Sequence, residues 1–192
     1  MKKIMFNDKF GLTQAVLEGR KIQTRRTMPT HIEAMLRHLS VLVPSNWTKD
    51  WSDSALSKLG ETMLPYKTGD IVAIAQSYKD CGAEAFYWKE TPGWTNKMFV
   101  KANLMPHHIK IERVRVERLQ DISEEDCLKE GIYEDGGNDS FIPHYFYDYY
   151  NSNSDGFKTP QLAYAHLIGK IGGKGTWEAN PLVFAYDFVL ID

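Results

Sequence analysis

The stretch "HHIKIERVRVERLQDI" (residues 107–122) is the clearest strand signal in the chain and decides the fold. Its apolar residues alternate with polar ones, and their parity changes once, between Ile109 and Ile111 on one side and Val114 and Val116 on the other. Because successive side chains of a strand point to opposite faces, one inserted residue restores a single apolar face. We therefore predict a long strand with a β-bulge near residues 112–113.

Further strand signals lie on both sides of this stretch. A turn at Gly69 and Asp70 leads into an apolar run from Ile71 to Ile74, and "LVFAYDFVLI" (182–191) predicts a last strand. The segments "EAFYWKE" (84–90) and "NKMFVKA" (96–102) predict two more strands, joined by a hairpin-like turn that contains Pro92 and Gly93.

Capping residues predict the helices. Leu12, Ala15 and Val16 have helical spacing before Gly19, which predicts an opening helix, and a second helix is predicted at residues 31–39. Ser123 precedes "EEDCLKEG" (124–131), and Thr159 with Pro160 opens a helix over "QLAYAHLIGKI" (161–171). Short strands without regular βα alternation indicate an α+β fold with a mixed or antiparallel sheet, and we predict a small barrel.

Composition limits the possible classes of protein. The 192 residues are 43% hydrophobic, which is enough for one sizeable core, so we predict a single domain over residues 1–192. Cys81 and Cys127 are too few for a disulfide framework or a structural zinc site, and no apolar run reaches the roughly 20 residues of a membrane span. We expect a cytoplasmic protein that binds no membrane, metal or cofactor.

The octet "GRKIQTRR" (19–26) places four cations within a chain whose formal net charge is -2. Such a patch either anchors phosphates or holds a reactive group in a positive field. Arg20 and Lys21 follow the predicted end of a helix, where cations interact favourably with the last carbonyls. That position does not explain Arg25 and Arg26, so we predict that the octet contacts an anion, with nucleic acid the leading possibility.

Four blocks of the sequence carry a resemblance to a known family. They are "LEGRKIQTRR" (17–26), "TGDIVAIAQSY" (68–78), "VERLQDISEEDCLKEGI" (116–132) and "WEANPLVFAYDFVLI" (177–191). In order and approximate spacing, the chain resembles the bacterial and phage members of the ASCH family. The resemblance implies a PUA-like small mixed β-barrel with flanking helices and a phage or prophage relation. Residues 27–62 and 133–157 then look like insertions.

The resemblance also implies a cleft beside the first helix that receives RNA or a nucleotide. One branch of small ASCH proteins removes the acetyl group from N4-acetylcytidine with a Lys, a Thr three residues later and a Glu in the capped helix. Carried over residue by residue, these fall on Lys21, Thr24 and Glu130. A Thr hydroxyl needs a neighbouring base to take its proton, and a Lys serves only when burial or nearby cations lower its pKa.

Three functions follow as alternatives. We favour RNA or nucleotide binding, in which Arg20, Lys21, Arg25 and Arg26 contact phosphates while Gln23 and Gln76 read base edges. Many phage-type members have an Arg and a Glu where this chain has Ala75 and Gln76, and Gln76 cannot act as a carboxylate. The second alternative is an amidohydrolase acting on acylated nucleosides through Thr24, Lys21 and Glu130. The third is a phage-derived accessory protein that binds another protein through its tyrosine-rich segment, residues 133–157.

Overall fold

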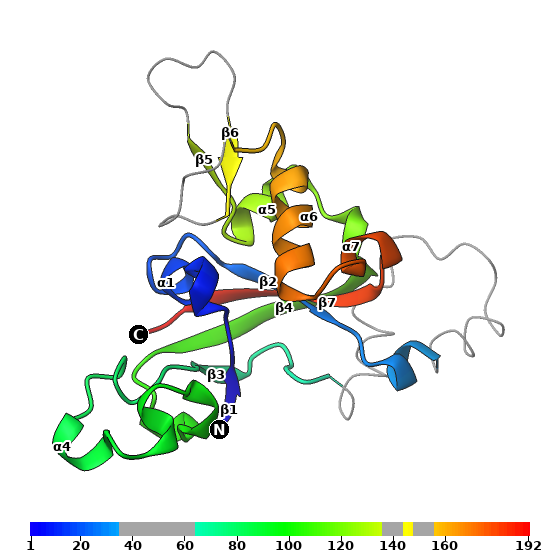
Figure 1. The fold of residues 1–192 in the computed structure, drawn as a ribbon. Helices are drawn as coiled ribbons and strands as arrows, with labels where there is room; N and C mark the ends of the chain where they lie inside the picture. Colours follow the sequence, from blue (N-terminus) through cyan, green and yellow to red (C-terminus); the bar gives the residue numbers. More distant parts are fainter. Residues whose placement is uncertain (35–63, 136–143, 148–155) are drawn as a thin grey trace.

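A computed structural model describes residues 1–34, 64–135, 144–147 and 156–192 (Figure 1). The fold is mixed α+β around a five-stranded sheet in the order β1-β3-β4-β7-β2. Its strands are β1 (Lys2–Ile4), β2 (Gln23–Thr27), β3 (Ile71–Ile74), β4 (His108–Arg118) and β7 (Leu182–Leu190). The β1–β3 pair is parallel and the other three pairs are antiparallel, so the predicted α+β class with a mixed sheet is confirmed.

The bulge predicted in the long strand is present. In the pairing of β4 with β7, Ile111 lies opposite Phe188 whereas Arg113 lies opposite Asp187, so residue 112 is the extra one. The bulge brings Ile109, Ile111 and Val114 into one hydrophobic core despite their different parities. After the bulge, Arg113 and Arg115 lie opposite Asp187 and Ala185, and in this register the Arg115 guanidinium lies 3.4 Å from the Asp187 carboxylate.

The capped helices form where their signals lie. Helix α1 (Leu12–Leu17) is followed by Gly19 with φ 72°, and α5 (Glu124–Lys129) begins with the Ser123 side chain accepting a hydrogen bond from the Asp126 amide. Helix α6 (Pro160–Ile171) has Thr159 as its N-cap, and a short helix α7 (Thr176–Ala179) follows. Helices α5 and α6 lie side by side over β4 and β7 (Figure 1). Of the helix predicted at 31–39, residues 31–34 are helical, and the rest lies outside the described residues.

The two strands predicted within residues 84–102 are wrong. This region contains helix α4 (Ala85–Trp88) and three 3-10 helices, η2 (Pro92–Trp94), η3 (Lys97–Phe99) and η4 (Ala102–Leu104). Local hydrogen bonds decide the outcome, because the Asn96 side chain accepts from the Met98 amide and caps a helical turn. The side of β3 away from β4 is paired with β1, so these segments do not pair with β3. Several of their apolar residues are exposed instead, namely Phe86, Tyr87, Met98 and Phe99.

A closed barrel is not found in the described part of the chain. Strands β1 and β2 are the two edges of the sheet, and no pairing joins them. Within the predicted insertion 133–157, β5 (Tyr133–Asp135) and β6 (His144–Phe146) form a separate antiparallel pair. At the start of the predicted insertion 27–62, Met28 and Ile32 are buried in the main core. Residues 35–62 lie outside the described residues, and none of the helices described is both long and apolar enough to span a membrane.

The burial of β4 gives a stability prediction with a matched control. Ile111 is fully buried, whereas Ile71 on the neighbouring strand β3 is 51% exposed. Ile111→Ala removes three buried carbons and leaves a cavity, so we expect the free energy of unfolding to fall by about 2–5 kcal/mol. Ile71→Ala should cost less than about 1 kcal/mol, mainly through β-propensity. Urea denaturation of both variants measures this difference, and equal losses would contradict the position of β4 in the core.

Candidate active site

Backbone hydrogen bonds fix the start of the basic octet against two helices. The Lys21 amide donates to the Ala15 carbonyl of α1 at 2.9 Å, and the Ile22 amide donates to the Lys129 carbonyl of α5 at 2.9 Å. Gly131, which follows α5, has φ 98°, a conformation that favours glycine, and a Cβ added at this position would lie 3.5 Å from Cβ of Lys21. These contacts place Lys21 beside the last residues of α5 although the two are far apart in sequence.

Lys21 forms a buried ion pair with Glu130. Its Nζ donates to Oε2 of Glu130 at 2.5 Å and to the backbone carbonyl of the same residue at 2.7 Å. The two residues are only 2% and 4% exposed. Burial lowers the pKa of Lys21, although the Glu130 carboxylate acts in the opposite direction, and the positive charges of Arg26 and Arg25 lower the pKa further. The structure thus provides an amine that can lose its proton more readily than an exposed lysine.

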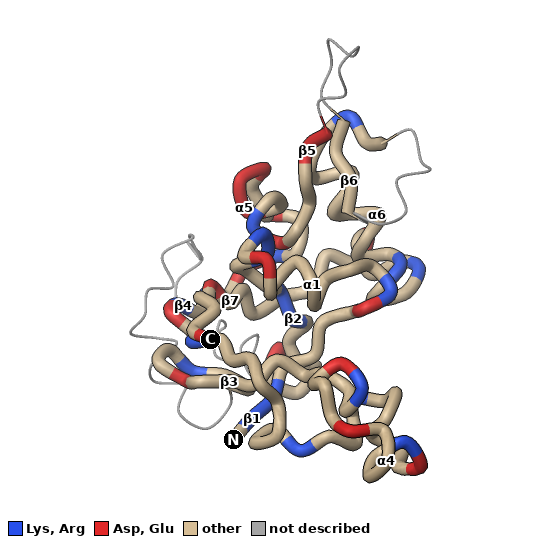
Figure 2. Tube along the Cα trace, turned by 90° about the vertical axis from the view of Figure 1, so that its left-hand side faces the viewer, with Lys and Arg blue, Asp and Glu red and all other residues tan. Residues whose placement is uncertain are grey.

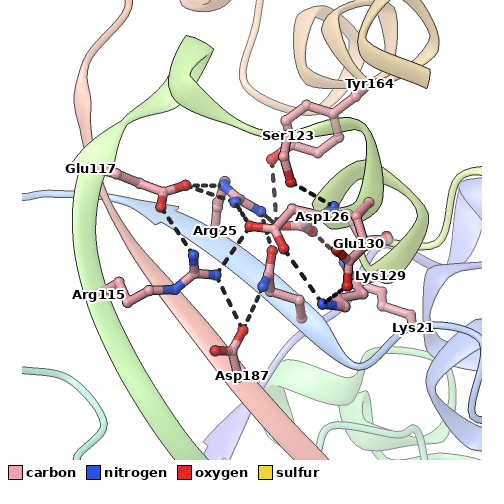
Figure 3. Close-up of polar contacts among 12 residues, drawn as sticks. Lys21, Arg25, Arg115, Glu117, Ser123, Asp126, Lys129, Glu130, Tyr164 and Asp187 are labelled. Atoms are coloured by element: carbon pink, nitrogen blue, oxygen red, sulfur yellow. Dashed lines mark hydrogen bonds and ion pairs between the residues drawn. The ribbon is translucent and has the colours of Figure 1, made fainter. Parts of the chain in front are cut away.

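Arg25 connects this pair to a larger network of buried charges (Figure 3). Its Nη1 lies 3.1 Å from Oε1 of Glu130, its Nη2 lies 2.8 Å from Oδ2 of Asp126, and its Nε donates to Glu117 at 2.7 Å. The side chain is 1% exposed. Although burial acts in the opposite direction, the carboxylates of Glu130 and Glu117 raise the pKa of Arg25. Three carboxylates therefore hold this guanidinium inside the protein.

A second arginine extends the network across the sheet. Arg115 on β4 contacts Asp126 at 3.1 Å and Asp187 of β7 at 3.4 Å (Figure 3). Gln23 donates to Asp187 and accepts from Arg25. On the other side, the buried Tyr164 hydroxyl of α6 donates to Oε1 of Glu130 at 3.5 Å. The network therefore joins three strands of the sheet to helices α5 and α6.

Sequence reasoning did not find this network. Its unforeseen members are Arg115, Glu117, Asp126, Tyr164 and Asp187. From the sequence alone, the alternating charges of β4 indicate ordinary exposed pairs. Two signals point toward the network: Arg115 and Glu117 share one strand face, and Asp126 and Glu130 share one helix face. Neither signal identifies the partner, because this depends on how β2 and α5 pack together.

A pocket of about 470 Å³ opens beside the edge strand β2. Its apolar walls come from the segment before α1, from the first residue of α1 and from α6, and they include Phe6, Leu12, Leu167, Ile168 and Ile171. Lys21, Thr24 and Glu130 all line this pocket. Thr24 is 4% exposed and belongs to β2, three residues after Lys21. The arrangement combines a hydroxyl, a buried amine and a carboxylate with a largely apolar wall.

The structure divides the predicted site residues into two groups. Lys21, Thr24, Arg25, Arg26 and Glu130 line the pocket. Arg20, Gln23 and Gln76 do not belong to its lining. Arg20 pairs with Glu18 at 2.8 Å outside the pocket, Gln23 takes part in the charge network, and the Gln76 side chain is 7% exposed at the end of β3.

The four cations of the octet do not form one exposed basic surface. Lys21, Arg25 and Arg20 each contact a carboxylate, and basic and acidic residues lie next to one another around α5 (Figure 2). Arg26 differs, because its Nη2 donates to the Met5 carbonyl and its guanidinium lies 5.7 Å from the Phe6 ring centroid. No ion pair of Arg26 occurs among the described residues, so it is the cation of the octet with the most capacity for an anion.

The described ranges contain no group of three or more His, Cys, Asp or Glu side chains placed to hold a metal ion. The acids nearest the pocket contact arginine and lysine side chains instead. The polar groups of the pocket are therefore amine, guanidinium, hydroxyl and carboxylate.

Comparison with known proteins does not place the chain in a family. A scan against protein-family models finds no match, and searches of curated proteins and of solved structures find no similar protein. The resemblance to the ASCH family therefore rests on the four sequence blocks.

The network predicts very different effects for two arginines of the octet. Arg25→Met keeps an unbranched apolar side chain but leaves three carboxylates without their shared partner, so we expect a loss of about 3–5 kcal/mol in the free energy of unfolding. Arg20→Met removes a pair that is partly exposed to water and should cost at most about 1 kcal/mol. Urea denaturation at neutral pH compares them. Similar losses in both variants would mean that the buried contacts of Arg25 contribute no more than a surface pair.

Proposed function

We propose that the protein is an amidohydrolase that removes an acyl group from an acylated nucleoside of the N4-acetylcytidine type. The observation that carries the proposal is the buried contact between Lys21 and Glu130 in the pocket that Thr24 also lines. A lysine whose pKa is lowered by burial is a suitable general base for a hydroxyl nucleophile. The resemblance to the ASCH family selects the same three residues, and a PUA-like relation is part of the proposal.

The first half of the reaction forms an ester on the protein. Neutral Lys21 takes the proton of the Thr24 hydroxyl while the oxygen attacks the acyl carbon of the substrate. The bond between the acyl carbon and the nitrogen then breaks, and the leaving amine receives the proton from Lys21. Glu130 orients the lysine amine and stabilises its charged form through the direct contact of their side chains.

The second half restores the protein. A water molecule loses a proton to Lys21 and attacks the ester carbon. The acyl group leaves as a carboxylic acid, and Thr24 recovers its hydroxyl proton from Lys21. The net reaction consumes one amide and one water and yields one carboxylic acid and one amine.

The volume and the lining of the pocket suit a small, partly flat substrate. Its volume of about 470 Å³ lies within the range of small-molecule sites, roughly 300–1,000 Å³. The leucine and isoleucine side chains of α6 offer apolar contact to a base and its acyl group, while the polar groups lie at β2 and at the end of α5. An acylated nucleobase has the same division between a flat apolar face and a polar edge.

Substitution of Thr24 gives the direct test. Thr24→Val keeps the shape of the side chain but removes the nucleophile, so we expect turnover of N4-acetylcytidine to cytidine to fall by about 100-fold or more. Thr27→Val, at the exposed end of the same strand, is the matched control and should keep wild-type turnover. Chromatography of the released cytidine provides the measurement. Equal turnover by Thr24→Val and wild type, or none by wild type, would remove this mechanism.

RNA or nucleotide binding remains a second candidate because of Arg26. This residue lines the pocket, and the exposed Lys9 of the segment before α1 also lines it. The two cations come from different elements and can contact a phosphate attached to a nucleoside. Arg25 and Lys21 face carboxylates, so we assign the phosphate contacts to Arg26 and Lys9 in place of the full octet.

Salt dependence tests this second candidate. If Arg26 contacts phosphate, the logarithm of the affinity for a single-stranded RNA should fall with the logarithm of salt concentration by roughly 0.7 per phosphate contact. Arg26→Gln should reduce that slope by about one contact, whereas Arg20→Gln should leave it unchanged. Fluorescence anisotropy with a labelled oligonucleotide gives the slopes. Binding that does not respond to salt, or equal slopes in both variants, would contradict the contact.

A further inference from the structure

The two oxygens of the Glu130 carboxylate have different partners. Oε2 accepts from Lys21 at 2.5 Å, whereas Oε1 accepts from Arg25 at 3.1 Å and from the Tyr164 hydroxyl at 3.5 Å. All four side chains are buried. The carboxylate is therefore shared between a lysine on one side and an arginine with a tyrosine on the other.

Other contacts fix the arginine in this position. Nε and Nη2 of Arg25 bind Glu117 and Asp126, and Nη1 also donates to Gln23. Because each nitrogen of the guanidinium has a partner, the side chain cannot turn away from Glu130 without breaking several contacts. A planar guanidinium with its donors in a fixed fork suits this arrangement better than a lysine amine.

Arg25 determines whether the Glu130 carboxylate still has a cationic partner when Lys21 loses its proton. Without Arg25, a neutral Lys21 would leave the Glu130 carboxylate as an uncompensated charge in the interior, which is strongly unfavourable. With Arg25 present, the carboxylate keeps a cationic partner in both protonation states of Lys21. Arg25 remains protonated throughout, since arginine does not release its proton in proteins.

We propose that Arg25 is a positioning residue that allows Lys21 to become neutral by holding the other oxygen of Glu130. The inference rests on the proposed function for its use in catalysis, but the contact geometry carries it. Burial and the charges of Arg25 and Arg26 lower the pKa of Lys21, in agreement with this role. Other charged or titratable groups that line the same pocket are Asp8, Lys9, Lys97 and Tyr164.

Titration of Lys21 tests the proposal without any substrate. We would label the lysines with ¹³C at Cε and follow their signals by NMR from about pH 6 to about pH 11, a range that brackets the ordinary lysine pKa. The Lys21 signal is assigned by its loss in Lys21→Met. In wild type we expect its titration midpoint to lie below that of the exposed lysines. A midpoint equal to or above theirs would overturn the proposal.

Two variants then distinguish the effect of Arg25 on the Lys21 titration midpoint from the effect of burial. In Arg25→Gln, the midpoint of Lys21 should rise, because Glu130 has only Lys21 left as a cationic partner. Arg115→Gln is the matched control: it belongs to the same network but has no contact with Glu130, so its effect on the midpoint should be less than half as large. An unchanged midpoint in Arg25→Gln, or an equal rise in both variants, would overturn the role of the contact.

A milder variant covers the case in which Arg25→Gln does not fold. Tyr164→Phe removes the other donor to Oε1 of Glu130. We expect it to raise the Lys21 midpoint by a smaller amount than Arg25→Gln does. An unchanged midpoint would contradict the proposal. Failure of the proposed function can be distinguished from failure of this inference about Arg25. A protein that does not hydrolyse N4-acetylcytidine but shows these titrations would contradict the hydrolase and leave the role of Arg25 supported.

Discussion

The buried guanidinium of Arg25 links strand β2 to strand β4 and helix α5. It brings together a carboxylate of β4 and two carboxylates of the α5 region, and so joins the edge strand β2 to the helix that supplies Glu130. A buried ion pair is not strongly stabilising in general, because desolvation offsets the attraction between the charges. Its importance lies in geometry, because the observed arrangement of β2 and α5 places all three acids around one guanidinium. That arrangement also brings Lys21 against Glu130.

The same network explains how a slightly acidic chain keeps a lysine amine buried beside a carboxylate. Three of the four cations of the octet contact carboxylates, so most of its charge is paired within the protein. Burial disfavours the charged amine of Lys21, and the arginine keeps Glu130 compensated when that amine is neutral. The pocket beside β2 then offers a hydroxyl, a base and an apolar wall within one small volume.

Features set by short-range rules could be predicted from the sequence. The parity change in residues 109–116 located the bulge, and Ser123 and Thr159 located two helix starts. Both signals are visible in the sequence because helix capping and strand alternation depend only on residues that are close in the chain. The strands predicted within residues 84–102 failed because local capping favours helical turns there and because β1 takes the place beside β3, and this second condition is a property of the whole fold. The resemblance selected Lys21 and Glu130, whereas the partners of Arg25 depended on strand register and helix packing. For the same reason, the sequence could not indicate that most of the octet is internally paired.

Covalent capture of the acyl group is the most direct measurement of the central claim that Thr24, Lys21 and Glu130 act as one site. The protein would be mixed rapidly with N4-acetylcytidine, quenched in acid and analysed by peptide mass spectrometry. We expect one acetyl group on the Thr24 hydroxyl, formed in wild type and absent when Lys21 is replaced by Met. Acetylation of exposed lysines alone, or acetylation of Thr24 that does not require Lys21, would contradict it.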